Sequence, residues 1–158
     1  MSAASNDLED KLLDHVLRNT SYSQPSTLRI ALFAGTASDV LVALEAGSGA
    51  RTATNWGYYE ITGGAYVRTA ITFAAASGGS AASNANCTFA TADANYNNAA
   101  TSGSTITCIA VMDGAFTPDG STTHTGNVLF YGQLDNAKEV LSGDTFQITS
   151  GNLTISLA

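Results

Sequence analysis

The sequence predicts a mainly β protein: an antiparallel β-sandwich of jelly-roll type with one short α-helix at its N-terminus. From residue 27 onward, short apolar runs recur about every ten residues, separated by Gly, Ser, Asn and Asp, with no helical pattern between them. The length of 158 residues fits one domain, and a hydrophobic fraction of 44% is enough to form a core. We therefore expect a helical arm over residues 1–26 and a sandwich domain over residues 27–158.

The helical pattern covers residues 6–18. Asn6 is the expected N-cap, with Glu9 in capping-box spacing, and carboxylates in the first turn favour the positive end of the helix dipole. The pattern leaves two interpretations open: the apolar stripe packs on its own domain, or it docks on a neighbouring subunit. The stripe, which we take as the candidate assembly contact, consists of Leu8, Leu12, Leu13, Val16 and Leu17.

Strands and turns fill the rest of the chain. The strongly apolar segments 28–34 and 105–113 are predicted to lie centrally in a sheet. Glycine pairs place turns at residues 63–64 and 78–79, and residues 117–126 (TPDGSTTHTG) form an exposed loop. The other expected strands cover residues 39–44, 50–60, 66–73, 86–91, 127–134, 145–149 and 152–157, and the other expected loops cover 77–84 and 93–102.

The charge pattern excludes several functions. Six basic against thirteen acidic residues give a formal charge of −7, whereas a nucleic-acid groove needs clustered cations. No apolar run reaches the ~18 residues that cross a bilayer, and the N-terminus lacks the basic and apolar regions of a signal peptide. We therefore expect a soluble, unprocessed protein that binds neither nucleic acid nor membrane.

Residues with catalytic or metal-binding chemistry are few. His15 on the helix and His124 in the exposed loop are expected to be ordinary surface residues, and no spacing typical of a metal site occurs. A weak Ca²⁺ site at the Asp-Gly pairs 113–114 or 119–120 stays open as an alternative. Cys87 and Cys108 are expected to be buried free thiols, with a disulfide or a reactive site as the alternative. The expectation is a protein that is not an enzyme and has no cofactor.

An aromatic segment, Trp56-Gly57-Tyr58-Tyr59, allows three interpretations. These side chains bury large area at little entropy cost, so they are suited to a core, to a subunit interface or to stacking on a ligand. We take Trp56, Tyr58 and Tyr59 as a candidate subunit interface, with burial in the core as the other main interpretation.

Several segments, taken in order, resemble small virion proteins of tailed bacteriophages. The resemblance covers nearly the whole chain, and its motifs are structural and not catalytic. The aromatic segment and the loop 117–126 depart from the usual pattern. The similar segments are 10–15 (DKLLDH), 28–33 (LRIALF), 63–68 (GGAYVR), 71–73 (ITF), 127–134 (NVLFYGQL), 142–144 (SGD) and 151–157 (GNLTISL).

This resemblance implies a structural role in the virion. Because the chain is short and lacks a repetitive shaft, we expect first a capsid decoration (cement) protein on the outer capsid surface, bound to the major capsid protein. The resemblance also implies a homo-oligomer, a trimer at local three-fold positions. The alternative is a tail-fibre or tail-tip protein whose loop 117–126 touches a host glycan. A small hydrolase is the third and weakest hypothesis, because no acid–base constellation is recognisable.

Overall fold

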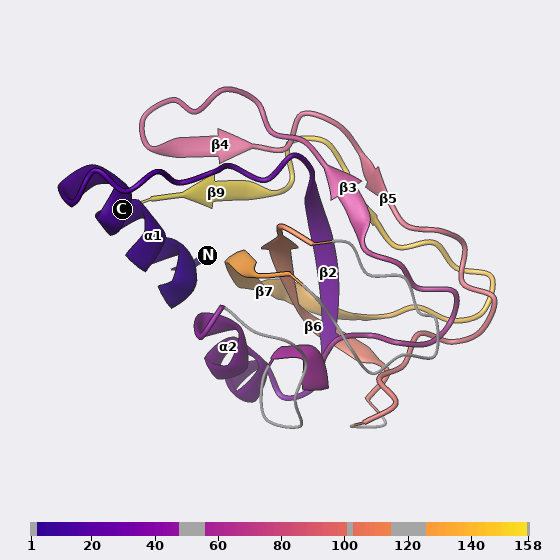
Figure 1. The fold of residues 1–158 in the computed structure, drawn as a ribbon. Helices are drawn as coiled ribbons and strands as arrows, with labels where there is room; N and C mark the ends of the chain where they lie inside the picture. Colours follow the sequence, from indigo (N-terminus) through magenta and orange to yellow (C-terminus); the bar gives the residue numbers. More distant parts are fainter. Residues whose placement is uncertain (1–2, 48–55, 101–102, 115–125, 158) are drawn as a thin grey trace.

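The computed structural model describes residues 3–47, 56–100, 103–114 and 126–157 (Figure 1). Within them the chain is mainly β, and every strand pairing is antiparallel, which confirms the predicted fold class. The elements are β1 (Ala3–Ala4), α1 (Asn6–Leu17), β2 (Leu28–Ala34), α2 (Ala37–Glu45), the 3₁₀ helix η1 (Trp56–Tyr58), β3 (Thr69–Ile71), β4 (Ser80–Ala82), β5 (Cys87–Thr88), β6 (Thr105–Met112), β7 (Val128–Glu139), β8 (Gln147–Ile148) and β9 (Thr154–Ser156).

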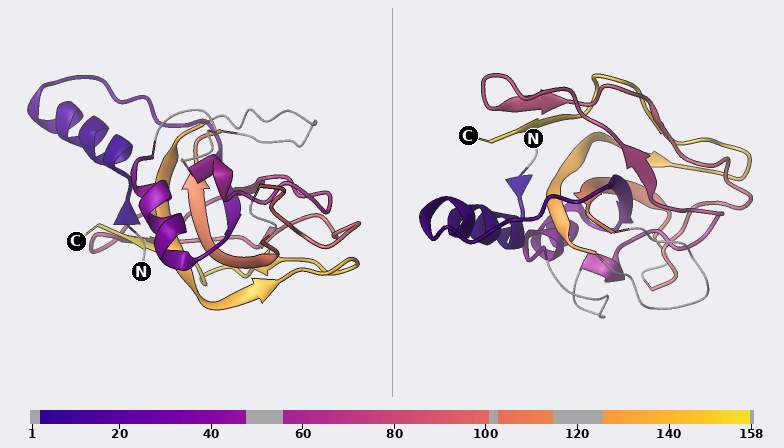
Figure 2. Two further views of the ribbon diagram at one scale, coloured as in Figure 1. Left: turned by 90° about the horizontal axis from the view of Figure 1, so that it is seen from below. Right: turned by 45° about the horizontal axis from the view of Figure 1, so that its top comes forward.

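The body has three layers. The middle layer is a five-stranded sheet in the order β1-β7-β6-β2-β3. One face of this sheet packs against the two small sheets β4-β9 and β5-β8, and the other face packs against α2 and η1 (Figures 1 and 2). The pairing of a large sheet with smaller ones is consistent with a sandwich, and the helical layer on the outer face was not predicted.

Burial of both faces explains why β2 and β6 are almost wholly apolar. In β2, Ile30 and Leu32 face the small sheets, while Ala31 and Phe33 face α2. All four side chains have no exposed area. A strand that is covered on two sides needs apolar residues at consecutive positions, so the prediction that residues 28–34 and 105–113 are central strands is confirmed.

The strand β7 is longer than expected and irregular. It runs to Glu139, and its register against β6 shifts between the pairs Cys108↔Gln133 and Ile106↔Lys138. The intervening residues therefore bulge out of the ladder. The sequence predicted only residues 127–134, because the polar stretch that follows lacks alternation; most of that stretch is exposed to solvent.

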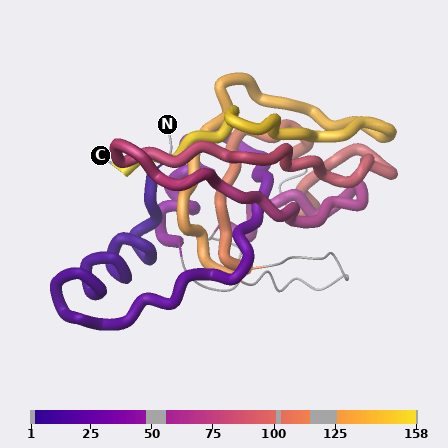
Figure 3. The backbone as a smooth tube through the Cα atoms, turned by 90° about the horizontal axis from the view of Figure 1, so that it is seen from above, coloured from indigo at the N-terminus to yellow at the C-terminus, as the bar shows by residue number. Residues whose placement is uncertain are grey.

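The helix α1 stands at the side of the body and is followed by a connection without regular structure, residues 18–27 (Figure 3). Ser5, not Asn6, is its N-cap: the hydroxyl accepts a hydrogen bond from the backbone N–H of Leu8 and donates one to the carbonyl of Val128. The prediction of the cap was one residue too late, since a serine and an asparagine stand side by side and either can cap.

The predicted strand over 39–44 is wrong, because these residues belong to the helix α2. Val40, Ala43 and Leu44 are buried at helical spacing i, i+3, i+4, while Val42 is 70% exposed. A short apolar run fits both the helical and the strand period. Here the run forms a helix whose apolar side covers the second face of the large sheet. The expectation that no helix separates the strands is wrong for the same reason.

Other differences are local. The strand predicted over 66–73 is reduced to Thr69–Ile71, and the loop predicted over 77–84 contains β4. In the segment 50–60, residues 56–58 form a 3₁₀ helix, and residues 50–55 lie outside the described part. The predicted turn after residue 63 is present: Gly64 has φ +74°, and a Cβ there would approach Tyr96 and the carbonyl of Ala94.

Candidate functional site

The aromatic segment is divided between core and surface. Trp56 has no exposed area and packs with Phe33, Val40 and Met112 in the core on the α2 side. Tyr58 and Tyr59 are half-buried, and their rings meet edge to face at 5.2 Å. Trp56 therefore serves the core of its own chain, and only the two tyrosines present area to a partner.

A buried ion pair lies directly behind this segment. Glu60 accepts hydrogen bonds from Arg68 Nε at 2.6 Å and from Arg68 Nη2 at 2.8 Å, a bidentate arrangement in which both side chains are fully buried. The guanidinium also donates to the carbonyl of Gly114 at 2.9 Å and lies 5.2 Å from the centre of the Trp56 ring. The pair is therefore part of a packed polar network inside the fold.

Further hydrogen bonds tie this network to the central sheet. Tyr66 donates to Glu60 at 3.0 Å and accepts from the backbone N–H of Leu32 in β2 at 3.1 Å. Asn98 donates to the carbonyls of Tyr58 and Glu60. These contacts fix the path of residues 56–68, which has little regular secondary structure of its own.

The electrostatics of the network keep Tyr66 neutral and Arg68 charged. Burial raises the pKa of Tyr66 well above its ordinary value, and the charge of Glu60 raises it further. Burial opposes the charge of Arg68, but the hydrogen bond and charge of Glu60 outweigh it, so the pKa of Arg68 is raised. Both charged side chains are buried and paired with each other, so the network braces the fold of the described residues.

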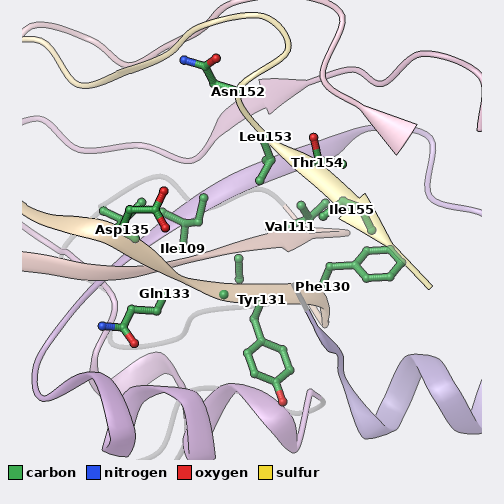
Figure 4. A pocket seen from close by; sticks show the side chains of 13 residues that line it. Ile109, Val111, Phe130, Tyr131, Gln133, Asp135, Asn152, Leu153, Thr154 and Ile155 are labelled. Atoms are coloured by element: carbon green, nitrogen blue, oxygen red, sulfur yellow. The ribbon is translucent and has the colours of Figure 1, made fainter. Parts of the chain in front are cut away.

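A surface hollow of the described molecule lies between β7 and β9 (Figure 4). We call it the β7–β9 groove; its shared floor consists of Val111, Phe130 and Ile155. One part, about 270 Å³, extends toward Leu134 and Asn152. The groove thus lies between the small sheet β4-β9 and the face of the large sheet, to which β6 and β7 contribute Val111 and Phe130.

The other part of the groove is apolar. It has a volume of about 250 Å³ and continues from the shared floor to the beginning of β2 and the end of the described chain. Figure 4 shows that Tyr131 and Gln133 point to the opposite side of β7, toward the helices, so they contribute little side chain to the floor. The residues that line this part besides the floor are Leu28, Phe73, Ala76, Gly79, Ser80, Ala81 and Leu157.

The apolar stripe of α1, like the aromatic segment, is partly buried in its own chain and partly exposed to solvent. Leu8 is 3% exposed and packs on the body, and Leu12 is half-buried. Leu13 is 56% exposed, and Val16 and Leu17 are each 75% exposed. The first turn of the helix is thus anchored on its own domain, while the last two turns present apolar side chains to solvent.

Most of the exposed loop 117–126 lies outside the described residues, as do His124 and the pair Asp119-Gly120. Its base is described: the carboxylate of Asp113 accepts hydrogen bonds from the backbone and side-chain nitrogens of Asn127. These two hydrogen bonds hold the two ends of the loop together. His15 Nδ1 lies 3.0 Å from the carbonyl of Thr20 and 3.4 Å from the backbone nitrogen of Tyr22, so the ring contacts the connection after α1.

The two cysteines are buried free thiols, as predicted. Cys87 packs in the core between the sheets and Cys108 in the core beneath α2, so the five-stranded sheet separates them. Burial raises the pKa of Cys87 to about 11 and also raises that of Cys108.

The thiols should therefore react slowly in the native protein. A pKa of about 11 in place of 9.0 leaves about 100-fold less thiolate at pH 8, before access is considered. Because the folded-state pKa is raised, the contribution of Cys87 to stability is full below pH 9 and is lost between pH 9 and about 11. Titration with Ellman's reagent should find no fast thiol at pH 8 and two after denaturation. A fast thiol in the native state would contradict the burial.

Two negative findings concern the described residues only. They contain no group of three or more His, Cys, Asp or Glu side chains placed to hold a metal ion. None of their helices has the length and hydropathy of a membrane span.

The described part of the chain thus presents an exposed apolar stripe on α1, two half-buried tyrosines and the β7–β9 groove. Comparison with known proteins specifies the class. A family model matches residues 3–156, almost the entire chain, and it describes structural proteins of a phage virion. The chain belongs to the family described as "Podophage GP4 fiber I protein gp80". No curated protein matches the chain. The resemblance to small virion proteins of tailed phages is thereby confirmed.

Sequence reasoning missed the buried ion pair and the groove. A signal for the first was present, since Glu60 stands between Tyr59 and Ile61, and Arg68 between Val67 and Thr69, in otherwise uncharged surroundings. The groove had no such signal, because its walls come from segments far apart in the sequence.

Proposed function

We propose that this protein is a component of a podophage fibre and that it contributes to attachment of the virion to its host. The observation that carries the proposal is the match of residues 3–156 to a family of phage fibre proteins. The fold is compatible with such a role: a body braced by a buried ion pair carries an exposed helix and a loop closed at its base.

The family description favours attachment over capsid decoration. The sequence analysis placed decoration first because the chain is short and has no repetitive shaft. A short chain is also able to form the tip or a joint of a fibre built from several proteins, so length does not decide between the two roles. Binding to the major capsid protein and a position on the outer capsid surface would follow only from decoration.

The copy number in purified virions tests the proposal. Quantitative gel densitometry against the major capsid protein should give a few to a few dozen copies, and antibody labelling in electron micrographs should mark the tail end. Hundreds of copies in fixed ratio to the shell subunit would overturn the fibre assignment in favour of decoration. Absence from the particle would overturn any virion role.

Shortening the loop 117–126 should reduce host adsorption without loss of folding. Asp113 and Asn127, which close the loop, are retained in this variant, so the ends stay in place. Phage carrying the shortened loop should have intact heads and adsorb at least tenfold more slowly to host cells. As a matched control, the turn at residues 142–144 can be changed to an equivalent tight turn. Equal adsorption of both phages would show that the loop does not contact the host.

A further inference from the structure

We propose that this protein forms a closed homo-oligomer in which the last two turns of α1 of one copy occupy the β7–β9 groove of a neighbouring copy. The inference goes beyond the proposed function and does not depend on it. It rests on two complementary apolar surfaces of the same chain, neither of which is covered by the described residues: the exposed stripe of Leu13, Val16 and Leu17, and the groove.

The two surfaces match in size and chemistry. The apolar part of the groove has a volume of about 250 Å³ and is lined by no ionisable side chain. A cavity of about 150 Å³ accommodates a benzene molecule, so this part has room for the side chains of Leu13 and Leu17, one turn apart on one helix face. A groove without charges selects an apolar stripe and not a charged partner.

The occupant is a second copy because the arm is held away from its own groove. Ser5 caps α1 and is bonded through its side chain to Val128 and through its backbone N–H to Leu129, and Leu8 is buried beside it. These contacts fix the direction in which the helix leaves the body (Figure 3). The last two turns could fold back only if these contacts broke, whereas another molecule can approach them from solvent.

The amount of area that one arm covers argues for a closed arrangement. Three aliphatic side chains and the walls around them fall well short of the roughly 1,600 Å² that a standard interface buries. When every copy both gives and receives an arm, each copy makes two arm–groove contacts, and no further surface of the chain is needed. A head-to-tail contact gives a ring when the rotation between copies closes, as in a trimer, and a two-fold dimer closes by mutual exchange of the arms.

Two exposed valines provide a matched comparison. Val16 on α1 is 75% exposed and Val42 on α2 is 70% exposed, and Val42 does not line the groove. Sedimentation of the full-length chain over 1–100 µM should show a closed oligomer. Val16→Asp should weaken self-association at least tenfold, and Val42→Asp should leave it unchanged. Circular dichroism checks that both variants are folded. A monomeric wild-type chain at 100 µM, or equal behaviour of the two variants, would overturn the proposal.

Cross-linking between different copies tests the groove itself. A chain with Leu17→Cys is mixed with a size-tagged chain with Ala76→Cys, because Ala76 is exposed and lines the apolar part. Oxidation should give a disulfide-linked heterodimer, while Val42→Cys mixed with the same tagged chain should give none. Cys87 and Cys108 are buried and do not compete. If the two new cysteines link only when placed on one chain, the arm reaches its own groove and the proposal is wrong.

Discussion

Replacing Glu60 with methionine should lower the free energy of unfolding by about 3–5 kcal/mol. The carboxylate accepts two hydrogen bonds from Arg68 and one from Tyr66 inside the fold, where neither charged side chain is exposed. Without it the guanidinium stays charged, since arginine does not lose its proton in proteins. A loss of this size is a large fraction of the free energy of unfolding of a small domain. Urea unfolding followed by tryptophan fluorescence measures the loss.

The partner substitution separates the charge from the packing. In Arg68→Met the buried carboxylate can be neutralised by a proton, so the loss should shrink as the pH falls from 7 to 4. In Glu60→Met the loss of stability should not shrink over this pH range, because the guanidinium stays charged. The double variant, with methionine at both positions, should recover most of the stability, because no charge is left buried. A double variant as unstable as the worse single one would show that the hydrogen bonds, and not the pairing of charges, hold residues 56–68.

Replacing Trp56 with alanine should cost about 3–5 kcal/mol, the range typical of a large aromatic side chain removed from a core. Trp56 is fully buried among Phe33, Val40 and Met112, and it also packs against the guanidinium of Arg68. The cavity would lie between the central sheet and α2. Thermal unfolding followed by circular dichroism in the far ultraviolet measures the effect, since the variant has no tryptophan left.

Tyr58→Ala is the matched control for this prediction. Tyr58 belongs to the same 3₁₀ helix but is half-buried, so its loss should cost less than half as much. A small effect of Trp56→Ala would mean that the tryptophan does not support the core of the free protein. The coupling between Trp56 and Arg68 can be measured with the corresponding double variant, in which the two losses should be less than additive.

Local sequence patterns predicted the fold where an element is long enough to show whether one side or both sides are buried. The almost wholly apolar segments of β2 and β6 indicated central strands, and helices and small sheets cover both of their faces. The helix α1 was predicted within one residue at each end from its i, i+4 leucines. Where an element is short, local pattern fails. Val40, Ala43 and Leu44 suit a helix and a strand equally until the face of the sheet that they cover is known.

The binding surfaces were predictable only in part. The stripe on α1 could be read from its spacing, but which half of it is anchored depends on Ser5 reaching Val128 across the fold. The β7–β9 groove is lined by residues of β6, β7 and β9, which belong to two different sheets, so no single segment of the sequence encodes it. In the aromatic segment the sequence left core and interface open for Trp56, because the residues that bury it, Phe33, Val40 and Met112, come from other elements.

The anchoring of α1 also sets the order of events during synthesis. Ser5 is 123 residues away from Val128, to which it is bonded, and β1 pairs with the same strand, β7. At roughly 5–20 residues per second, a ribosome adds those residues in roughly 6–25 s. The segment around Ser5 leaves the ribosome well before its partner in β7 and is therefore among the last to find its place. On a polysome, the segments around Ser5 of neighbouring nascent chains are close together throughout this interval, so the proposed exchange of arms would begin before folding of either chain is complete.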